Sequence, residues 1–408
     1  QPASGMDVVV VQVTCSNPYT AAGRSAVFRM RSVDSIAALK ELIRENLRVL
    51  VQEQRILTSA FGQELHDNKT LWELRTQPGE PVSVTLVPAP INLLVLIGGS
   101  GHTRLCLFDA ARGEPLHELT EPKDNVLAAV VDWNHHRGLS AGWESTVRLW
   151  DFAGGKTLRE LQGHNACGVF CLAADWVAQK AVSGGQDCTL RIWDLNSCML
   201  VQTLVGHAQP IFCVSMEANA RRVLSGSQDR TLRLWNLDCC ETMPELTGHS
   251  GTIFCLAVDW SWMRALSGSW DCTLRLWDLS TGETLQELRY HTNAVFSCAM
   301  DWNSQQAVSG GADNAICVWD LKQGLPIRQL YGHDSTVTCF EVEWSTNRLL
   351  SGSLDGTLFL WDIESGERLQ TLQGRTGDVR CVQARWLGGA NGAQAVPQVA
   401  VPNALVPR

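Results

Sequence analysis

Short runs of apolar residues, broken by Gly, Ser or Asp, fill most of the chain after residue 91. One such unit contains Val169–Leu172, a second run that ends in Ser183, and a third run at Thr189–Asp194. A fourth run, Leu200–Leu204, leads to the next Gly-His pair. Runs of this length with turn residues between them favour β-strands over helices. The pattern therefore predicts a unit of four antiparallel strands.

This unit recurs with a period of 42 residues. Its clearest marker is a tryptophan at the end of the third strand, found at Trp193, Trp235, Trp277, Trp319 and Trp361. Trp150 lies 43 residues before the first of these, and Phe108 lies 42 residues before Trp150. Seven such units account for about 300 of the 408 residues, which leaves roughly 110 for a second domain. A repeat of four strands is typical of a propeller blade.

Each complete unit places four side chains at fixed offsets. A His stands 28 or 29 residues before the Trp, a Ser ten residues before it and an Asp six residues before it. On four antiparallel strands these offsets converge, so we expect hydrogen bonds that run from the indole through Ser and His to the carboxylate. The five full sets, called the tetrads below, are His164/Ser183/Asp187/Trp193, His207/Ser225/Asp229/Trp235, His249/Ser267/Asp271/Trp277, His291/Ser309/Asp313/Trp319 and His333/Ser351/Asp355/Trp361.

A Ser, a His and an Asp within reach of one another also suggest a hydrolase triad. Five copies of a triad have no mechanistic purpose, whereas five copies of a network that fixes strand register would each stabilise one blade. We therefore interpret the tetrads as structural. No phosphate-binding loop, nucleophile elbow or metal-ligand cluster accompanies them in the sequence. The sequence predicts no enzyme activity, no catalytic residue, no metal site and no cofactor.

Residues 91–386 resemble the WD-repeat β-propeller family, on the Gly-His, Ser-Gly and Trp-Asp signatures of these units. The resemblance implies an all-β propeller of seven four-stranded antiparallel blades over residues 89–387. The first unit lacks its own first strand, and residues 378–386 repeat the pattern of that strand. We expect residues 378–386 to complete this blade and close the ring. Residues 388–408 are expected to be a disordered tail.

The sequence pattern of residues 6–88 predicts a separate small domain. Residues 1–5 before it are expected to be disordered. Extended segments at residues 6–17 and 26–31 come before a helical pattern that begins at Ile36, and shorter strands follow near residues 55–58 and 81–87. This order, with the motifs Asp34-Ser35-Ile36 and Gln54-Arg55-Ile56-Leu57, resembles the ubiquitin-like family. The resemblance implies a small α+β β-grasp fold.

The segment departs from the ubiquitin-like pattern in two ways. No Gly-Gly end follows the last strand, because the chain continues through Val87-Pro88, so conjugation to other proteins is not expected. Leu57 matches the centre of the family's apolar recognition patch, whereas Thr85 stands where an aliphatic residue is usual. Two interpretations stay open: a module that docks a second protein through Leu57, and a cap that only stabilises the propeller.

Composition narrows the classes of partner. The chain carries 33 Lys and Arg against 42 Asp and Glu, a net charge of −9, with no basic block, so nucleic-acid binding is not expected. No apolar stretch reaches the roughly 18 residues that a membrane helix needs, so no membrane association is expected. The 15 cysteines lie partly on the 42-residue grid and lack CxxC spacing, which favours buried thiols in a reducing compartment. We therefore expect an intracellular protein, in the cytoplasm, the nucleus or both.

Two sets of side chains are candidates for partner binding. The innermost strands carry an aromatic series at Phe170, Phe212, Phe254 and Phe296, continued by Thr338 and Arg380. The loops beside the tetrad acids carry Trp143, Gln186, Gln228 and Trp270. Together they predict an aromatic, glutamine-rich funnel that grips an extended peptide. The alternative is that the phenylalanines pack between blades. A second series is expected to pack hairpins at the opposite face: Trp133, Trp176, Trp260, Trp302, Trp344 and Trp386.

These features favour a non-catalytic protein-interaction scaffold. The propeller face would bind a partner peptide or protein, and the ubiquitin-like domain would dock a second protein in a ubiquitin- or proteasome-linked pathway. The alternative is a ribosome-assembly factor, because a ubiquitin-like domain before a WD propeller resembles the Notchless-type proteins. In either case we expect a monomer within a larger complex.

Overall fold

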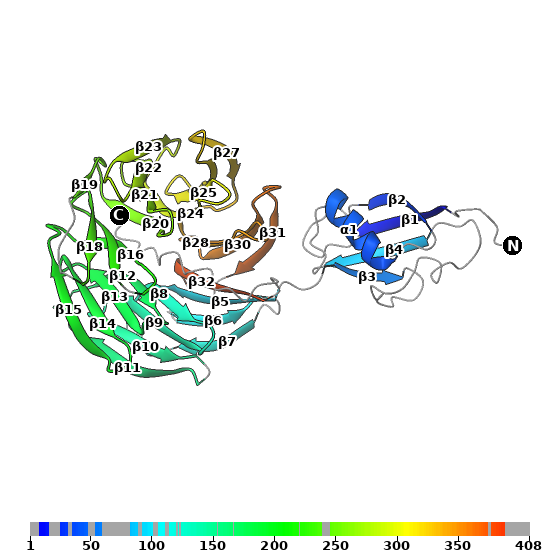
Figure 1. The fold of residues 1–408 in the computed structure, drawn as a ribbon. Coiled ribbons are helices and arrows are strands. Elements are labelled where there is room, and N and C mark those ends of the chain that lie inside the picture. The colour runs from blue at the N-terminus through cyan, green and yellow to red at the C-terminus, as the bar shows by residue number, and fades with distance from the viewer. Residues whose placement is uncertain are drawn as a thin grey trace. The chain divides into compact units, whose positions relative to one another are not determined.

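The computed structural model describes residues 8–15, 25–31, 35–47, 54–58, 82–88, 92–100, 105–110, 114–119, 121, 124–152, 154–165, 167–219, 221–238, 245–373 and 377–387. The chain forms two compact units, Gln1–Asn92 and Leu93–Arg408 (Figure 1). The sequence places this boundary a few residues earlier, after residue 88. The expected disorder of residues 1–5 and 388–408 lies outside the described residues.

The first unit contains a four-stranded mixed sheet and one helix. Strands β1 (Val8–Cys15), β2 (Ser25–Arg31), β3 (Gln54–Thr58) and β4 (Val82–Pro88) pair in the order β2-β1-β4-β3, and β1 and β4 run parallel. Helix α1 (Ile36–Leu47) follows Ser35, whose side-chain oxygen accepts a hydrogen bond from the Ala38 N–H at 3.3 Å. Such an N-cap satisfies an amide that has no partner within the helix.

The core of the first unit lies between this sheet and α1. Val11 and Val13 of β1 point to one face of the sheet, because they are two residues apart. Ile36, Leu39 and Ile43 follow helical spacing on one side of α1, and all five side chains are fully buried. The strand order and the parallel pair are compatible with a β-grasp, and the ubiquitin-like assignment stays a prediction.

The second unit is a propeller of seven four-stranded blades (Figure 1). The innermost strands contact one another in a closed circle, because the last of them packs against the first. In order around the ring they are β8 (Val126–Asp132), β12 (Val169–Asp175), β16 (Ile211–Met216), β20 (Ile253–Asp259), β24 (Val295–Asp301), β28 (Val337–Glu343) and β32 (Val379–Leu387).

The other strands build each blade outward by antiparallel pairing. The second strands are β9 (Arg137–Gly142), β13 (Lys180–Gly185), β17 (Arg222–Ser227), β21 (Arg264–Ser269), β25 (Gln306–Gly311), β29 (Arg348–Ser353) and β5 (Asn92–Gly99). The third are β10 (Thr146–Asp151), β14 (Thr189–Asp194), β18 (Thr231–Asn236), β22 (Thr273–Asp278), β26 (Ile316–Asp320), β30 (Thr357–Asp362) and β6 (Leu105–Asp109). The outermost are β11 (Lys156–Gln162), β15 (Met199–Val205), β19 (Leu246–Thr247), β23 (Thr284–Arg289), β27 (Leu325–Leu330), β31 (Arg368–Gln373) and β7 (Glu114–Leu119).

One blade combines strands that lie far apart in the sequence. Its order is β32-β5-β6-β7, so the innermost strand comes from residues 379–387 and the other three from residues 92–119. At the start of β32 the Gly377 N–H donates to the Ser100 carbonyl at 2.7 Å, and the Ser100 N–H donates to the Asp378 carboxylate at 2.9 Å. The ring is therefore closed within a blade, which leaves no unpaired inner edge on β5.

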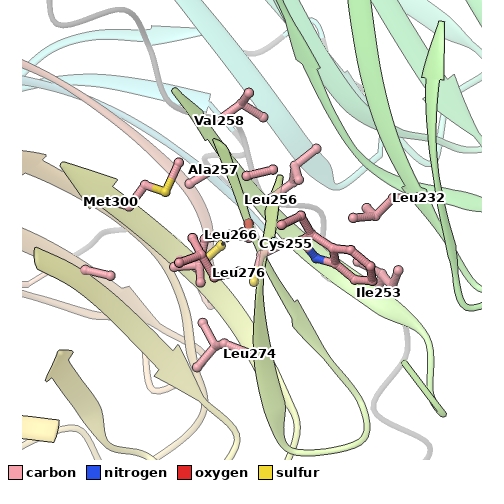
Figure 2. Close-up of a cluster of buried hydrophobic side chains, with 14 of the residues drawn as sticks. Leu232, Ile253, Cys255, Leu256, Ala257, Val258, Leu266, Leu274, Leu276 and Met300 are labelled. Atoms are coloured by element: carbon pink, nitrogen blue, oxygen red, sulfur yellow. Dashed lines mark hydrogen bonds between the residues drawn. The ribbon is translucent and has the colours of Figure 1, made fainter. Parts of the chain in front are cut away.

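Adjacent blades are held together by apolar side chains from three or more strands. In Figure 2, Ile253 and Leu256 of β20 lie among Leu232 of the preceding blade and Met300 of the following one. Each of these four side chains is at most 1% exposed. Packing between neighbouring blades therefore buries apolar side chains, as in other layered β folds.

A thiol and a glycine interlock at the inner part of the blades. A Cβ added to Gly268 would lie 2.5 Å from the Cys255 Sγ and 2.7 Å from Val295, so only glycine fits there. The same contact recurs at Cys171/Gly184, Cys213/Gly226, Cys339/Gly352 and Cys381/Gly98. In a sixth copy Ser297 replaces the cysteine beside Gly310, and its buried hydroxyl has no hydrogen-bond partner. The repeated cysteines are therefore packing residues, and the twelve described cysteines form no disulfide.

Candidate protein-interaction site

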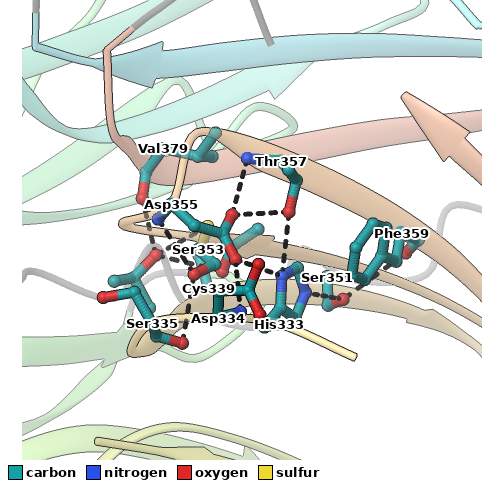
Figure 3. A network of polar contacts seen from close by, with 12 residues as sticks. His333, Asp334, Ser335, Cys339, Ser351, Ser353, Asp355, Thr357, Phe359 and Val379 are labelled. Carbon is teal, nitrogen blue, oxygen red and sulfur yellow. Dashed lines mark hydrogen bonds and ion pairs between the residues drawn. The ribbon is translucent and has the colours of Figure 1, made fainter. Parts of the chain in front are cut away.

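The tetrads form the hydrogen-bonded chains that their offsets predict. In all five blades the Trp indole N–H donates to the Ser hydroxyl at 2.7–2.8 Å, and the Ser oxygen lies 2.7–2.8 Å from His Nε2. His Nδ1 lies 2.7–3.2 Å from the Asp carboxylate. Because the carboxylate can only accept, Nδ1 carries the hydrogen and Nε2 accepts from the serine. Figure 3 shows the serine, histidine and aspartate of one copy, Ser351, His333 and Asp355.

The tetrad aspartates also organise the turn in which they lie. Asp229 accepts hydrogen bonds from the Thr231 N–H at 3.0 Å and the Thr231 hydroxyl at 2.7 Å, while its other oxygen accepts from the Ala208 N–H at 3.1 Å. Burial alone would raise the pKa of Asp229, but the hydrogen bonds from His207 and Thr231 hold that pKa well below its ordinary value. The carboxylate is thus ionised and tied to three chain segments.

The tetrad serines have no access to a substrate. Ser183, Ser225, Ser267, Ser309 and Ser351 are all fully buried. Each hydroxyl already bonds the indole on one side and the imidazole on the other. For His333, burial lowers the pKa, which keeps that ring neutral near pH 7. The geometry therefore suits a network that fixes strand register rather than a nucleophile.

The blade of β8–β11 keeps part of this network. Trp150 donates to Ser140 at 2.7 Å, as in the complete tetrads. Glu144 stands at the position of the aspartate and forms an ion pair with Arg148 at 2.5 Å. The acid of this blade thus has an arginine partner, although the blade lacks the tetrad histidine.

The phenylalanine series forms a buried aromatic belt at the tetrad end of the inner strands. Ring centroids lie 5.2 Å apart for Phe170–Phe212, 5.4 Å for Phe212–Phe254 and 4.7 Å for Phe254–Phe296. The four side chains are only 1–4% exposed. Each lies at a β-bulge, where the register between the first two strands shifts by one residue. A bulge redirects a side chain, which allows these rings to meet across the blade boundaries.

This burial corrects the expectation that the phenylalanines grip a peptide. Rings with at most 4% exposure offer no surface to a partner, and the alternative interpretation, packing between blades, describes them. The series also changes character in the next two blades. Thr338 donates its hydroxyl to the Val379 carbonyl at 2.6 Å, and Arg380 pairs with Asp378 at 2.5 Å. Neither side chain extends the aromatic belt.

The loop residues above the belt remain accessible and are here called the upper ring: Trp143, Gln186, Gln228 and Trp270, with Ala312 and Leu354 at the equivalent positions. Gln186 and Gln228 are exposed, Trp270 is 45% exposed and Trp143 is half-buried. Trp270 packs edge-on against Phe254 at 5.9 Å, and Trp143 does so against Phe170 at 5.4 Å. The N–H of every upper-ring residue bonds a carbonyl just before the innermost strand, at 2.8–3.2 Å. The upper ring is thus a rigid surface with two aromatic anchors.

The second tryptophan series lies at the opposite end of the blades, after the first strands. Arginines from the preceding blade cover three of its rings: Arg137 lies 5.9 Å from the Trp176 centroid, Arg222 5.6 Å from Trp260 and Arg264 5.7 Å from Trp302. Such cation–π contacts join neighbouring blades. These three rings therefore link neighbouring blades, and the expected packing of hairpins by the series stays a prediction.

A pocket at this second end was not predicted from the sequence. Its volume is about 480 Å³, and the ends of β16, β20, β24 and β28 line it. Glu217, Asp259 and Glu341 contribute carboxyl groups, and Trp260 and Trp344 contribute aromatic rings. These residues occupy positions in the repeat that differ from those of the upper ring, so the sequence pattern that groups the upper ring does not group them.

Other expected features can be placed only in part. Leu57 lies in β3 of the first unit, and its side chain is outside the described residues. Within the described ranges, no three His, Cys, Asp or Glu residues gather in a group that could hold a metal ion. None of the helices in the described part combines the length and apolarity that crossing a bilayer requires.

The closed ring, the four-stranded blades and the repeated tetrads define a β-propeller built from sequence repeats. Comparison with protein families identifies the repeat. Residues 155–194, 198–236, 240–278, 282–320 and 324–362 each match the WD40 model, described as "WD domain, G-beta repeat". The chain thus contains WD40 repeats, in agreement with the resemblance found in the sequence.

A comparison with curated proteins finds a similarity to the human (Homo sapiens) peroxisomal targeting signal 2 receptor. The two are 39% identical over 80 residues, which is 18% of this chain and 24% of that receptor. The matched stretch spans about a quarter of the relative's length. The likeness therefore concerns a short part of both proteins.

Proposed function

We propose that this chain is a non-catalytic scaffold that binds a partner protein through the upper ring. The observation that carries the proposal is the contrast between buried and accessible groups. The Ser, His and Asp side chains of the tetrads are hydrogen-bonded to one another inside the blades. Trp270, Gln186 and Gln228, in contrast, are exposed, and hydrogen bonds hold the backbone that carries them. Tryptophan on a rigid surface is a frequent anchor of protein interfaces.

The family and the relative support a binding role. WD40 repeats form propellers that present surfaces to other proteins, and the relative's name describes a receptor. Neither comparison identifies a partner for this chain. The twelve described thiols without disulfides support a reducing compartment, and we propose the cytoplasm or nucleus.

The test compares two exposed tryptophans of one blade. Trp270→Ala removes the anchor at the tetrad end, and Trp262→Ala is the matched control, because Trp262 is 56% exposed in the turn at the other end. Tagged full-length variants are expressed in cells, and captured proteins are quantified. We expect Trp270→Ala to reduce a defined set of partners by about fivefold or more, while Trp262→Ala leaves that set unchanged. Equal recovery with both variants would refute binding through the upper ring.

We also propose that the first unit docks a second protein in a ubiquitin- or proteasome-linked pathway. The support is the ubiquitin-like sequence order together with the sheet order β2-β1-β4-β3 and the parallel β1–β4 pair. The experiment measures capture of the full chain by immobilised ubiquitin receptors, with Leu57→Ala as the variant that should abolish it. Co-sedimentation with pre-ribosomal particles and no receptor capture would instead favour the ribosome-assembly alternative.

A further inference from the structure

The pocket lined by β16, β20, β24 and β28 lies at the end of the propeller opposite the tetrads. Asp259 and Trp260 mark the turn that joins β20 to β21, whereas the tetrad Asp271 lies in the turn that joins β21 to β22. Since antiparallel strands alternate in direction, these two turns are at opposite ends of one blade. The pocket is therefore independent of the upper ring.

The described residues that line the pocket include three acids and no Lys, Arg or His. Two of the acids are already engaged. Glu217 accepts two hydrogen bonds from Arg222 at 2.7 and 2.6 Å, and Asp259 accepts the N–H groups of Ser261 and Trp262 at 3.0 and 3.2 Å. These contacts hold their carboxylates in place and partly neutralise Glu217.

Glu341 has no such compensation. Its Oε1 accepts a hydrogen bond from the neutral Gln383 amide at 2.6 Å, and within the described part of the chain it forms no ion pair. Burial, with a smaller contribution from nearby Glu343, raises the pKa of Glu341 to about 8. Without a ligand the carboxyl is thus mostly protonated near pH 7. A carboxyl group that is buried beside a pocket without an ion-pair partner is a candidate for binding a cation.

The aromatic side of the pocket lacks a contact that three other blades make. Arg137, Arg222 and Arg264 each begin a second strand and cover the Trp of the next blade. The equivalent residue before Trp344 is Gln306, which begins β25. Among the described residues no cation lies over the Trp344 ring. Trp344 therefore differs from Trp176, Trp260 and Trp302 in having no guanidinium over its ring in the described part of the chain, and it lines the pocket.

We propose that this pocket binds a cationic side chain of a partner protein, a guanidinium group that pairs with Glu341 and packs against Trp344. A planar guanidinium can donate two hydrogen bonds to a carboxylate while its face stacks on an indole. The volume of about 480 Å³ admits a side chain of this length. The proposal rests on the scaffold function proposed above and adds a second, chemically distinct contact to it.

The experiment measures binding of one defined probe to the full-length protein. The probe is N-acetyl-arginine amide, titrated by saturation-transfer NMR, and the neutral isostere N-acetyl-citrulline amide is the comparison. We expect the arginine probe to bind at least about tenfold more tightly than the citrulline probe. Equal signals from the two probes would overturn the proposal.

Three variants locate the probe. Glu341→Gln keeps the shape and removes the charge, and it should weaken binding by about tenfold or more. Gln306→Arg supplies the missing internal guanidinium and should also weaken binding, by occupying the Trp344 ring. Glu283→Gln, at an exposed acid elsewhere on the propeller, changes the net charge equally and should alter affinity less than about twofold.

Unchanged affinity in Glu341→Gln, or equal loss in Glu283→Gln, would show nonspecific attraction to an acidic protein and refute the site. No partner protein enters this titration, so its outcome is independent of the Trp270 capture experiment. A negative probe titration would refute the pocket and leave the proposed binding through the upper ring untouched. Equal recovery of partners in the capture experiment would refute the upper ring and leave the probe titration interpretable.

Discussion

Glu341→Gln should stabilise the propeller, and the gain should grow with pH. Glu341 ionises at a pKa of about 8 in the folded protein, against an ordinary value of 4.5. Between these values the folded state holds a proton that the unfolded state has released. Wild-type stability from this group is therefore fully present below pH 4.5 and is lost as the pH rises towards 8. Glutamine does not titrate, so the variant avoids the loss.

The size of the effect follows from this difference in pKa. One pKa unit corresponds to about 1.4 kcal/mol, so the stability difference between the two proteins should grow by about 4 kcal/mol from pH 5 to pH 9. The side chain keeps some contact with solvent, which lowers the expectation to roughly 2–4 kcal/mol. For a domain of this size that gain corresponds to roughly 3–6 °C in Tm at pH 9.

The assay is differential scanning calorimetry of both proteins at several pH values between 5 and 9. Guanidinium salts are excluded from the buffers, because they would compete for the proposed site. The informative quantity is the difference in Tm between variant and wild type, since all other titrating groups cancel in it. A difference that stays constant from pH 5 to pH 9 would refute the burial of an uncompensated carboxyl at this position.

Three further predictions concern the propeller itself. Ser297→Cys should raise stability by about 1 kcal/mol, because it replaces an unpartnered buried hydroxyl with the thiol found in five other blades, and Cys255→Ser should lower stability. The reverse order of Tm values in thermal melts would contradict the packing argument. Asp271→Ala should lower the free energy of unfolding by about 2–4 kcal/mol at pH 7 and by less at pH 2–3. Hydrogen bonds from His249 and Thr273 outweigh burial and lower the pKa of Asp271, so the contribution of its carboxylate to stability is lost as the pH falls. A pH-independent cost would exclude the ionised network. Deletion after residue 374 removes β32 and exposes the inner edge of β5, so the product should aggregate; a soluble truncation with wild-type Tm would show that β32 is dispensable.

The propeller could be predicted because its information is local and repeated. The four residues of each tetrad lie within about 30 residues of sequence. The spacing of His249, Ser267, Asp271 and Trp277 therefore already implies that their side chains converge. The closure of the ring could be predicted for the same reason, since residues 378–386 repeat the pattern of the first strand at the 42-residue offset. The ubiquitin-like assignment of residues 6–88 and the role of Leu57 remain predictions.

The proposed binding surfaces are harder to predict from the sequence, because they depend on exceptions to the repeat. The sequence places Phe254 either in a surface funnel or between blades, and a β-bulge that alternation does not reveal directs it between blades. The pocket combines Glu341 with Trp344 and depends on Gln306 from another blade. A signal was present, since Gln306 stands at a position that is Arg or Lys in β9, β13, β17, β21 and β29. Only the structure shows that arginines at this position cover the tryptophans.

The pairing of β32 with β5 also sets an order of events during synthesis. About 280 residues separate the two strands, and ribosomes add roughly 5–20 residues per second. Strand β5 therefore waits roughly 15–60 s for its neighbour after it has been made. During that interval six blades can form while the seventh offers an open edge. The nascent chain thus has a defined period in which a chaperone that covers β5 would be most effective.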